Sequence, residues 1–477
     1  MEKVKIIAKN TFILIATKAI CNGLYFVTFI YIAKHLGSTD FGKLSFALAF
    51  TLVAGLLSDF GIKTYILREV AKDKSNLDTY LSNTLLIKSV FALINFLLIF
   101  IIINILNYPS ETVSVIYILS LSIIANSFTL LGNFIFRALA KTKYELLVSF
   151  VGRVFFLCLS LLCILFNLGL IPISLAFLGG NIISFLLCWI IIFKKFSRPK
   201  LEINFALWKL ILKNSFPFVM TEIFTEIYFR IDLIMLSMMK GDTVVGFYNA
   251  AYQLIEGLAK LIPSSFMGAL LPILSYYFIS SEESFKNYLQ KGFEILIILV
   301  LPLTIGLFML SERFTLLIYG KEFFPSIKAL QILSTSLIFI FINSLLGTAL
   351  TSINKQHLWT IGAGICMVVN IVLNFILIPP FSYVGSSYAT VITEGVLFLS
   401  GIWFLKQYIS VPFNYLLLGK VLIGCLVMSV LIYNLRFISL PLLIPVGIVT
   451  YLIPLFLLNT FSDAEIKIVK EIFAKTN

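Results

Sequence analysis

Fourteen long apolar runs follow one another along the chain and constrain its fold more than any other feature. A run of about 20 apolar residues can cross a bilayer as an α-helix, because each residue adds 1.5 Å toward a hydrocarbon thickness of about 30 Å. The sequence therefore predicts an all-α polytopic membrane protein with about 14 transmembrane helices. The predicted spans are 11–33, 44–62, 81–106, 112–136, 144–166, 169–193, 209–238, 244–271, 291–310, 326–350, 357–378, 383–405, 414–435 and 439–460.

The composition excludes the main soluble classes of protein. Of the 477 residues, 60% are apolar and 12% are charged, whereas soluble chains are about 45–50% apolar and about 25% charged. A soluble core cannot absorb this excess, so we expect apolar side chains to face lipid. The net charge of +13 would suggest nucleic acid in a soluble protein, but here we expect membrane lipids and no nucleic acid as partners.

Lysine and arginine fall mostly in every second segment between the predicted spans, beginning with the N-terminal tail. Positively charged segments stay in the cytoplasm during membrane insertion. We therefore predict that both termini are cytoplasmic. The strong excess of lysine over arginine is typical of an AT-rich prokaryotic genome, so we expect a multi-pass protein of the prokaryotic cell membrane.

A weak internal repeat divides the chain. The segment 36–47, after the first span, matches 240–250, after the seventh, when Gly42 is aligned with Gly246 at an offset of 204 residues. Coincidental loop glycines are the alternative. The repeat predicts two six-helix bundles related by pseudo-two-fold symmetry, and two additional C-terminal helices. The predicted parts are the N-terminal bundle 1–195, a cytoplasmic linker 196–208, the C-terminal bundle 209–407, two additional helices within 408–461 and a cytoplasmic tail 462–477.

Motifs for catalysis, metals or nucleotides are weak. The segment 37–43 fits the start of a phosphate-binding loop, but Leu44 stands where that motif needs a serine or threonine for Mg²⁺. The six cysteines lie in apolar runs without metal-ligand spacing, and only two histidines are present. We therefore expect no catalytic residue, no metal site and no cofactor.

Short motifs at the helix junctions resemble those of Wzx-type polysaccharide flippases. These flippases belong to the multidrug/oligosaccharidyl-lipid/polysaccharide (MOP) exporter superfamily, which is MATE-like in fold. The motifs are Leu36-Gly37 with Phe41-Gly42, Arg68-Glu69, Ser215-Phe216-Pro217, Arg230-Ile231-Asp232, the segment 245–252, and Ile318-Tyr319-Gly320. The resemblance implies two bundles around a central cavity that opens alternately to each side of the membrane.

The resemblance also implies a cargo and partners. The cargo would be an oligosaccharide or polysaccharide repeat unit linked to polyprenyl pyrophosphate, as in O-antigen biosynthesis. It would move from the cytoplasmic to the outer leaflet. A polysaccharide polymerase and glycosyltransferases would be the protein partners.

Cations inside the predicted spans are the first functional candidates, because a charge is costly in hydrocarbon and should face the protein interior or a wet cavity. Lys18, Lys88 and Arg153 have no acidic residue four positions away, so local pairing does not explain them. Together with Arg230 they are predicted to line a cationic cavity that binds the diphosphate of the cargo. Snorkelling, or a partner on a neighbouring helix, is the alternative.

Acidic residues concentrate in the seventh and eighth predicted spans. Coupling to an H⁺ or Na⁺ gradient is one role for them, and structural pairing is the other, because Glu226–Arg230 and Glu256–Lys260 have the i,i+4 spacing of helical ion pairs. Asp59 lies near the inner end of the second span. The candidate coupling or structural charges are Glu222, Glu226, Asp232, Glu256 and Lys260.

Two other functions compete with the flippase. A cation-coupled multidrug exporter of the MATE type would have the same fold, but that branch favours acidic residues in the N-terminal bundle, where this chain has basic ones. A membrane glycosyltransferase or polymerase would need a large outer loop, and the longest predicted outer loop is only 311–326. We therefore expect a transporter and not an enzyme.

Overall fold

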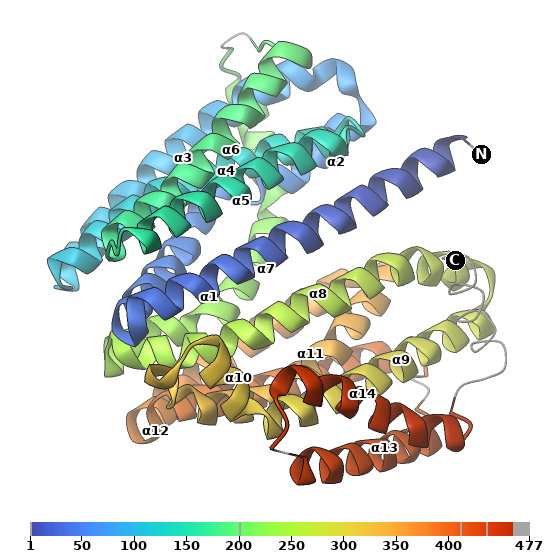
Figure 1. Cartoon of the computed structure of the whole chain (residues 1–477). Helices are drawn as coiled ribbons and strands as arrows, with labels where there is room; N and C mark the ends of the chain where they lie inside the picture. The colour runs from blue at the N-terminus through green and yellow to red at the C-terminus, as the bar shows by residue number, and fades with distance from the viewer. Residues whose placement is uncertain (1, 200–201, 411–412, 436, 461–477) are drawn as a thin grey trace. The chain divides into compact units, whose positions relative to one another are not determined.

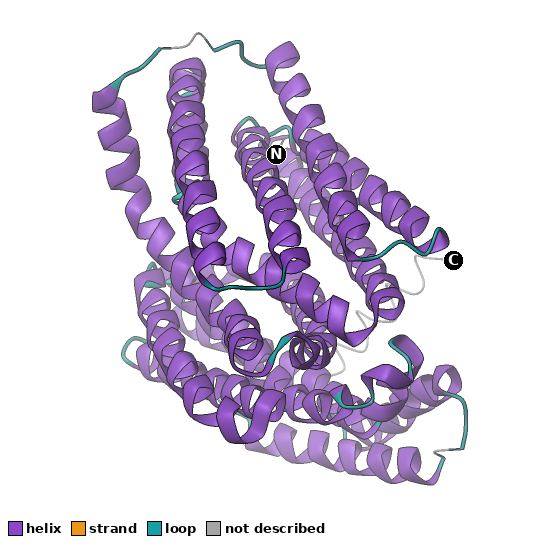
Figure 2. Cartoon of the chain, turned by 90° about the vertical axis from the view of Figure 1, so that its left-hand side faces the viewer, coloured by secondary structure: helices purple, strands orange, loops and turns teal. Residues whose placement is uncertain are grey.

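The computed structural model of the chain describes residues 2–199, 202–410, 413–435 and 437–460, with side chains from residue 20 onward except at 260 and 261. Within these ranges every regular element is a helix, and no strand occurs (Figure 2). The prediction of an all-α protein is confirmed. The predicted tail 462–477 lies outside the described residues, as does part of the linker.

Fourteen α-helices and two short 3₁₀ helices follow one another in the described chain (Figure 1). Their bounds are α1 Glu2–Asp59, α2 Ile62–Lys72, η1 Lys74–Asn76, α3 Leu77–Ile105, α4 Ser110–Ala138, α5 Thr142–Leu165, α6 Leu170–Lys195, α7 Phe205–Lys240, α8 Asp242–Ser280, α9 Glu282–Met309, α10 Ser311–Ile318, η2 Lys321–Phe323, α11 Ser326–Ser352, α12 Gln356–Lys406, α13 Tyr415–Asn434 and α14 Leu440–Leu457.

The helices correspond to the predicted spans after two differences are taken into account. Helix α1 bends at Gly37 (φ 72°) and α12 bends at Ser382 (φ 54°), so each covers two predicted spans. Helices α2 and α10 are short connecting helices that the apolar runs did not predict. Eleven helices of the described chain are long and apolar enough to cross a membrane, and α7 is not among them. Seven charged residues distributed along α7 account for that: Lys209, Lys213, Glu222, Glu226, Arg230, Asp232 and Lys240.

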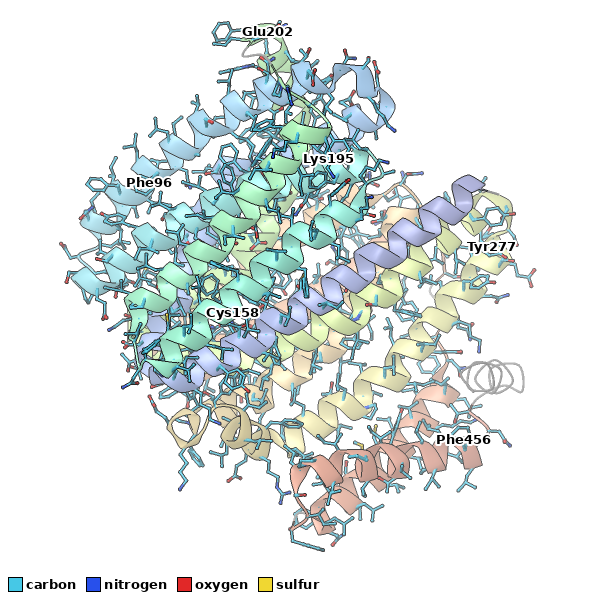
Figure 3. All side chains as sticks on the ribbon, turned by 45° about the horizontal axis from the view of Figure 1, so that its top comes forward. Phe96, Cys158, Lys195, Glu202, Tyr277 and Phe456 are labelled. Atoms are coloured by element: carbon cyan, nitrogen blue, oxygen red, sulfur yellow. The ribbon has the colours of Figure 1, made fainter. Side chains whose placement is uncertain are left out.

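The surface of α3 shows why this protein needs a membrane. Leu93, Leu97, Ile101 and Ile105 are each at least half exposed and recur every four residues along one face. The opposite face carries buried residues that include Lys88. In Figure 3, side chains project outward from the helices, for example at the labelled Phe96 of α3. An apolar exterior with charge in the interior is the arrangement expected in lipid, and the protein is a multi-pass integral membrane protein.

The chain separates into two compact units that interleave in sequence. Unit 1 comprises Met1–Gln253, Ile318–Phe323 and Ala363–Ala389, and unit 2 comprises Leu254–Leu317, Phe324–Gly362 and Thr390–Asn477. Within unit 1, α1 packs on α3, α4, α5 and α7, and α2 packs on α4 and α7. The predicted bundle boundaries remain predictions.

Within unit 2, the two C-terminal helices dock on α9. Helix α13 packs on both α9 and α14. The Tyr451 hydroxyl of α14 donates a 2.7 Å hydrogen bond to the backbone oxygen of Ile298 in α9. Arg313 of α10 donates a 2.7 Å bond to the backbone oxygen of Ile438, just before α14. These polar contacts fix the additional helices that lie outside the sequence repeat.

The end of the predicted linker is attached to α3. Asn83 of α3 accepts hydrogen bonds from the backbone nitrogen of Asn204 and from the indole of Trp208, both at 2.9 Å. The Asn204 side chain in turn caps α7 by accepting a 3.0 Å bond from the Leu207 nitrogen. Helix α7 therefore starts at a position that α3 determines.

A charge network as the candidate functional site

One carboxylate in unit 1 lies between two ammonium groups. Oδ1 of Asp59 is 2.5 Å from Nζ of Lys88, and Oδ2 is 2.5 Å from Nζ of Lys63. Lys88 also donates a 2.7 Å hydrogen bond to the Ser127 hydroxyl of α4. Its side chain is fully buried. A buried ammonium needs such partners, because removing the charge from water costs several kcal/mol.

A fourth charge comes from the second sequence repeat. Nζ of Lys63 donates a 3.1 Å hydrogen bond to Oε2 of Glu222 on α7. We call Asp59, Lys63, Lys88 and Glu222 the charge network. The network holds two positive and two negative charges, so it is neutral as a whole. Its part within the first repeat, however, carries one uncompensated positive charge, which Glu222 balances from the second repeat.

The corner between α1 and α2 brings Lys63 to α7. Helix α1 ends at Asp59, and Phe60 and Gly61 both adopt positive φ values, 44° and 67°. Gly61 lies so close to α7 that a Cβ there would be 2.7 Å from the backbone nitrogen of Val219. Only glycine allows this approach together with this backbone conformation. Glu222 follows Val219 by about one helical turn, which places its carboxylate beside Lys63.

Exposure is graded across the network. The side chains of Lys88 and Asp59 are 0% and 7% exposed, whereas those of Lys63 and Glu222 are 17% and 25% exposed. Burial alone would lower the pKa of Lys63, but the Asp59 and Glu222 carboxylates outweigh burial and raise its pKa. Lys63 therefore stays protonated at neutral pH, and it is the cation of the network that is accessible from outside the protein.

A second polar cluster surrounds Asp232 in unit 1. Its carboxylate accepts 2.6 Å hydrogen bonds from the Tyr248 hydroxyl and from the side-chain amide of Asn374. The oxygen of Asn374 accepts a 2.7 Å bond from the Ser386 hydroxyl, and the side-chain oxygen of Asn370 lies 3.0 Å from the Asn374 nitrogen. Asp232, Asn370, Asn374 and Ser386 thus bring several oxygens together at a buried point.

The remaining predicted site residues differ in their surroundings. Arg153 is half-buried, lies 4.6 Å above the Tyr25 ring, and forms no ion pair with any residue that the structure describes. Arg230 lies 3.8 Å from Glu226, whose side chain is 40% exposed. Glu256 is half-buried. The side chains of Lys18 and Lys260 lie outside the described residues.

Lys88 has the neighbouring-helix partner that the sequence left as an alternative, because Asp59 lies 29 residues earlier in the chain. Lys63 was not among the predicted site residues, because it lies in one of the basic segments between predicted spans that indicate the orientation of the chain. One signal was available: Asp59 and Lys63 have the same acid-before-base i,i+4 spacing as the pairs noted in the seventh and eighth spans.

The segment that resembles a phosphate-binding loop has a structural role instead. Nζ of Lys43 lies 2.8 Å from Asp40 and 2.7 Å from Glu111, so its charge is already compensated. The backbone nitrogen of Ser38, directly after the bend, donates a 2.6 Å hydrogen bond to the Glu322 carboxylate. A carboxylate at a helix N-terminus stabilises the unpaired backbone N–H groups there. These contacts occupy the positions where a phosphate would have to bind.

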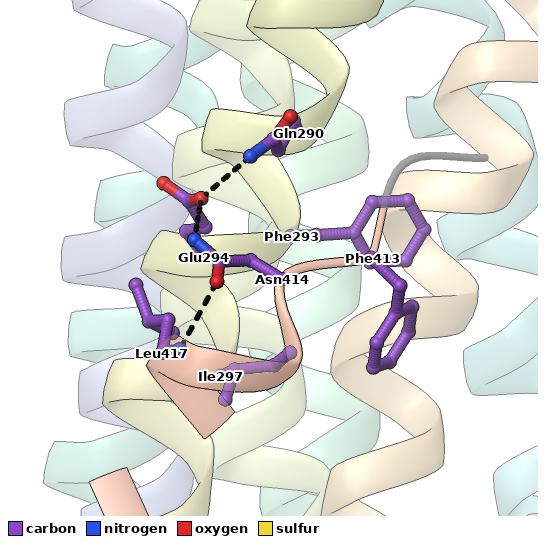
Figure 4. A pocket seen from close by; sticks show the side chains of 7 residues that line it. All are labelled: Gln290, Phe293, Glu294, Ile297, Phe413, Asn414 and Leu417. Atoms are coloured by element: carbon purple, nitrogen blue, oxygen red, sulfur yellow. Dashed lines mark hydrogen bonds between the residues drawn. The ribbon is translucent and has the colours of Figure 1, made fainter. Parts of the chain in front are cut away.

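A small pocket in unit 2 is lined by Gln290, Phe293, Glu294, Ile297, Phe413, Asn414 and Leu417 (Figure 4). Gln290 and Asn414 donate 2.9 Å and 2.8 Å hydrogen bonds to Oε1 of Glu294. Asn414 also caps α13 by accepting a bond from the Leu417 nitrogen. The polar groups of this pocket are therefore engaged in attaching α13 to α9.

Two family models match the chain. A model described as polysaccharide biosynthesis protein matches residues 7–278, and one described as lipid II flippase MurJ matches residues 194–453. Among curated proteins, a probable low-salt glycan biosynthesis flippase, Agl15 of Haloferax volcanii, is 21% identical over 87% of this chain and 86% of its own length.

Solved structures share the fold. A lipid II flippase MurJ in an inward closed conformation has a TM-score of 0.80 at 19% identity, covering 93% of this chain and 98% of that one. An inward-facing multidrug resistance MATE transporter of the MOP superfamily has a TM-score of 0.67 at 15% identity, covering 81% and 95%. The predicted MATE-like fold class is thereby confirmed.

Proposed function

The chain belongs to the polysaccharide biosynthesis protein family, and from this premise we propose that it is a flippase for lipid-linked glycan precursors. The cargo is an oligosaccharide or polysaccharide repeat unit on polyprenyl pyrophosphate, and it moves from the cytoplasmic to the outer leaflet of the prokaryotic cell membrane. The observation that carries this proposal is the match to the probable glycan biosynthesis flippase along 87% of the chain.

The charge network supports an anionic head group as the part of the cargo that the protein must hold. A diphosphate cannot enter hydrocarbon without partners that replace its hydration. Within the first repeat, Lys63 and Lys88 carry two positive charges and Asp59 carries one negative charge. One positive charge is therefore left for an anion from outside the first repeat. Arg153 adds a half-buried guanidinium in the same repeat. Charge-assisted hydrogen bonds from such groups are about twice as strong as neutral ones.

We assign coupling to an H⁺ or Na⁺ gradient to the cluster around Asp232. Its oxygens come from a carboxylate, two amides and a hydroxyl, the ligand types that hard cations prefer. A thermal-stability series of the purified protein in NaCl and in choline chloride tests this assignment. Sodium coupling predicts stabilisation by NaCl that Asp232→Asn abolishes. Equal stability in both salts, with no pH dependence that Asp232→Asn removes, contradicts it.

Complementation of a flippase-deficient bacterial host tests the transport function itself. Glycan export should return when the chain is expressed, and its level in the membrane should be checked by immunoblot. Efflux of a cationic dye from the same cells measures the multidrug alternative, which shares the fold at a lower TM-score. Dye efflux without glycan export would overturn the flippase proposal and favour the multidrug exporter.

A further inference from the structure

We propose that Glu222 occupies the position of a cargo phosphate, and that the diphosphate head group displaces it from Lys63 during transport. This inference rests on the proposed function and adds a residue, Lys63, and a mode of regulation to it. Lys63 is the contact to the anion, and Glu222 is the internal anion that holds the site when no cargo is bound.

The charge balance supports the exchange. Asp59 is shared by two ammonium groups, so Lys63 and Lys88 together need one further negative charge. Glu222 supplies that charge at 3.1 Å from Nζ of Lys63. If Glu222 moves away while nothing replaces it, a partly buried cation is left without its full compensation. An incoming phosphate restores the balance, because it offers the same kind of oxygen acceptor at the same atom.

Accessibility points to Lys63 and not to Lys88 as the residue that exchanges partners. Lys88 is fully buried, and its ammonium is engaged by Asp59 and by the Ser127 hydroxyl. Lys63 and Glu222 are 17% and 25% exposed, so an anion can approach their pair without disrupting the interior. Lys88 therefore acts as a positioning residue that holds Asp59, and Asp59 orients Lys63.

The local backbone makes the pair a junction between the two sequence repeats. Lys63 belongs to α2 of the first repeat, and Glu222 belongs to α7 of the second. Gly61 brings the start of α2 against the backbone of α7 one turn before Glu222. Loss of the Lys63–Glu222 ion pair would remove one of the contacts that hold α2 against α7. Cargo binding and separation of α2 from α7 would then be one event.

Binding of inorganic pyrophosphate to the purified full-length protein tests the exchange. Glu222→Gln removes the competing carboxylate and should tighten pyrophosphate binding roughly tenfold or more, the size expected for one charge-assisted contact. The double variant Glu222→Gln/Lys63→Gln should lack this gain. Lys63→Gln alone should bind pyrophosphate no more tightly than the wild type. Glu111→Gln is the matched control, because it frees Lys43 from an ion pair of similar length elsewhere in unit 1 and should leave binding unchanged.

A second variant and a second ligand keep the test decisive. Glu222→Asp retains the charge but shortens the side chain, so it should fold even if Glu222→Gln does not, and should show a smaller gain. Farnesyl pyrophosphate compared with inorganic pyrophosphate separates a lipid-linked head group from a free anion, since only the former should gain further affinity from its tail.

Wild-type affinity in both Glu222 variants, or a gain that survives Lys63→Gln, would overturn the exchange. Complementation by the wild-type chain distinguishes this failure from failure of the flippase proposal. If the wild-type chain restores export and the Glu222 variants bind pyrophosphate with unchanged affinity, the flippase proposal stands and the exchange proposal fails. If the Glu222 variants gain pyrophosphate affinity through Lys63 and the wild-type chain restores no export, the exchange proposal stands and the flippase proposal fails.

Discussion

Gly42 and Gly246 each face the backbone of the segment that contains the other. A Cβ on Gly42 would lie 1.8 Å from the carbonyl oxygen of Asp242, and a Cβ on Gly246 would lie 2.0 Å from that of Ser38. The two glycines are 204 residues apart, as are Ser38 and Asp242. The same offset relates Thr39 to Thr243, whose hydroxyls are 2.9 Å apart. The two repeats therefore meet here through equivalent positions.

Replacing either glycine of this contact should force the two segments apart. We expect Gly42→Ala and Gly246→Ala each to lower stability by about 1–3 kcal/mol, the usual cost of overpacking. Thermal unfolding of the purified protein in detergent measures this. Gly23→Ala is the control, because a Cβ there meets nothing within 4 Å. A Gly42→Ala midpoint equal to that of Gly23→Ala would contradict the close contact.

The Asp59–Lys88 pair should be essential for folding. Asp59→Asn leaves a fully buried ammonium without its carboxylate, and loss of one partner of a buried pair costs about 3–5 kcal/mol. We expect a sharp drop in folded yield, measured by size-exclusion chromatography of a fluorescent fusion. The double variant Asp59→Asn/Lys88→Met should recover much of this yield. If the single variant folds as the wild type does, the pair is not structural.

Arg153 should matter for transport and little for stability. It forms no ion pair among the described residues, so Arg153→Gln leaves no buried carboxylate uncompensated. We expect Arg153→Gln to reduce glycan export in the complementation assay by about tenfold or more. Arg153→Lys should retain part of the export because it keeps the charge. Normal export by Arg153→Gln at wild-type expression would remove Arg153 from the predicted cationic cavity.

The predicted orientation can be tested at two exposed positions. Glu202 lies in the linker and is labelled at its exposed position in Figure 3, and Lys321 lies in the short helix η2. In a variant without native cysteines, a membrane-impermeant thiol reagent added to intact cells should label Lys321→Cys and not Glu202→Cys. Both should react after the membrane is permeabilised. The reverse pattern in intact cells would invert the topology.

Apolar runs predicted the helical framework because a spanning helix requires a minimum apolar length, whatever its neighbours are. The runs 357–378 and 383–405 anticipated the bend at Ser382, although α12 continues through it. Short helices such as α2 carry no such signal. Their position depends on contacts like that of Gly61 with Val219, which are distant in sequence.

The candidate site was predictable only in part, because charge pairing across helices leaves no local trace. Lys88 was recognised as a buried cation, but its partner Asp59 comes from another helix. Lys63 was hidden among the basic residues that predict orientation, since its pair with Glu222 joins positions 159 residues apart. The offset that aligned Gly42 with Gly246 could identify equivalent positions, but it could not reveal that equivalent positions touch.

The bend at Gly37 in α1 has a counterpart at Gly241, between α7 and α8. Gly241 also has a positive φ, 86°, and the two glycines are again 204 residues apart. Contacts between equivalent positions are the kind that two copies of one chain make across a two-fold axis. Two copies of a shorter chain with a single such bend would therefore meet through the same glycine. Joining two such copies in one chain would make the partner permanent and leave each copy free to change. Ser45 and Asn249, again 204 residues apart, show such a difference: the Asn249 side-chain amide donates a 2.6 Å hydrogen bond to the Ser45 hydroxyl, so equivalent positions meet through unlike side chains.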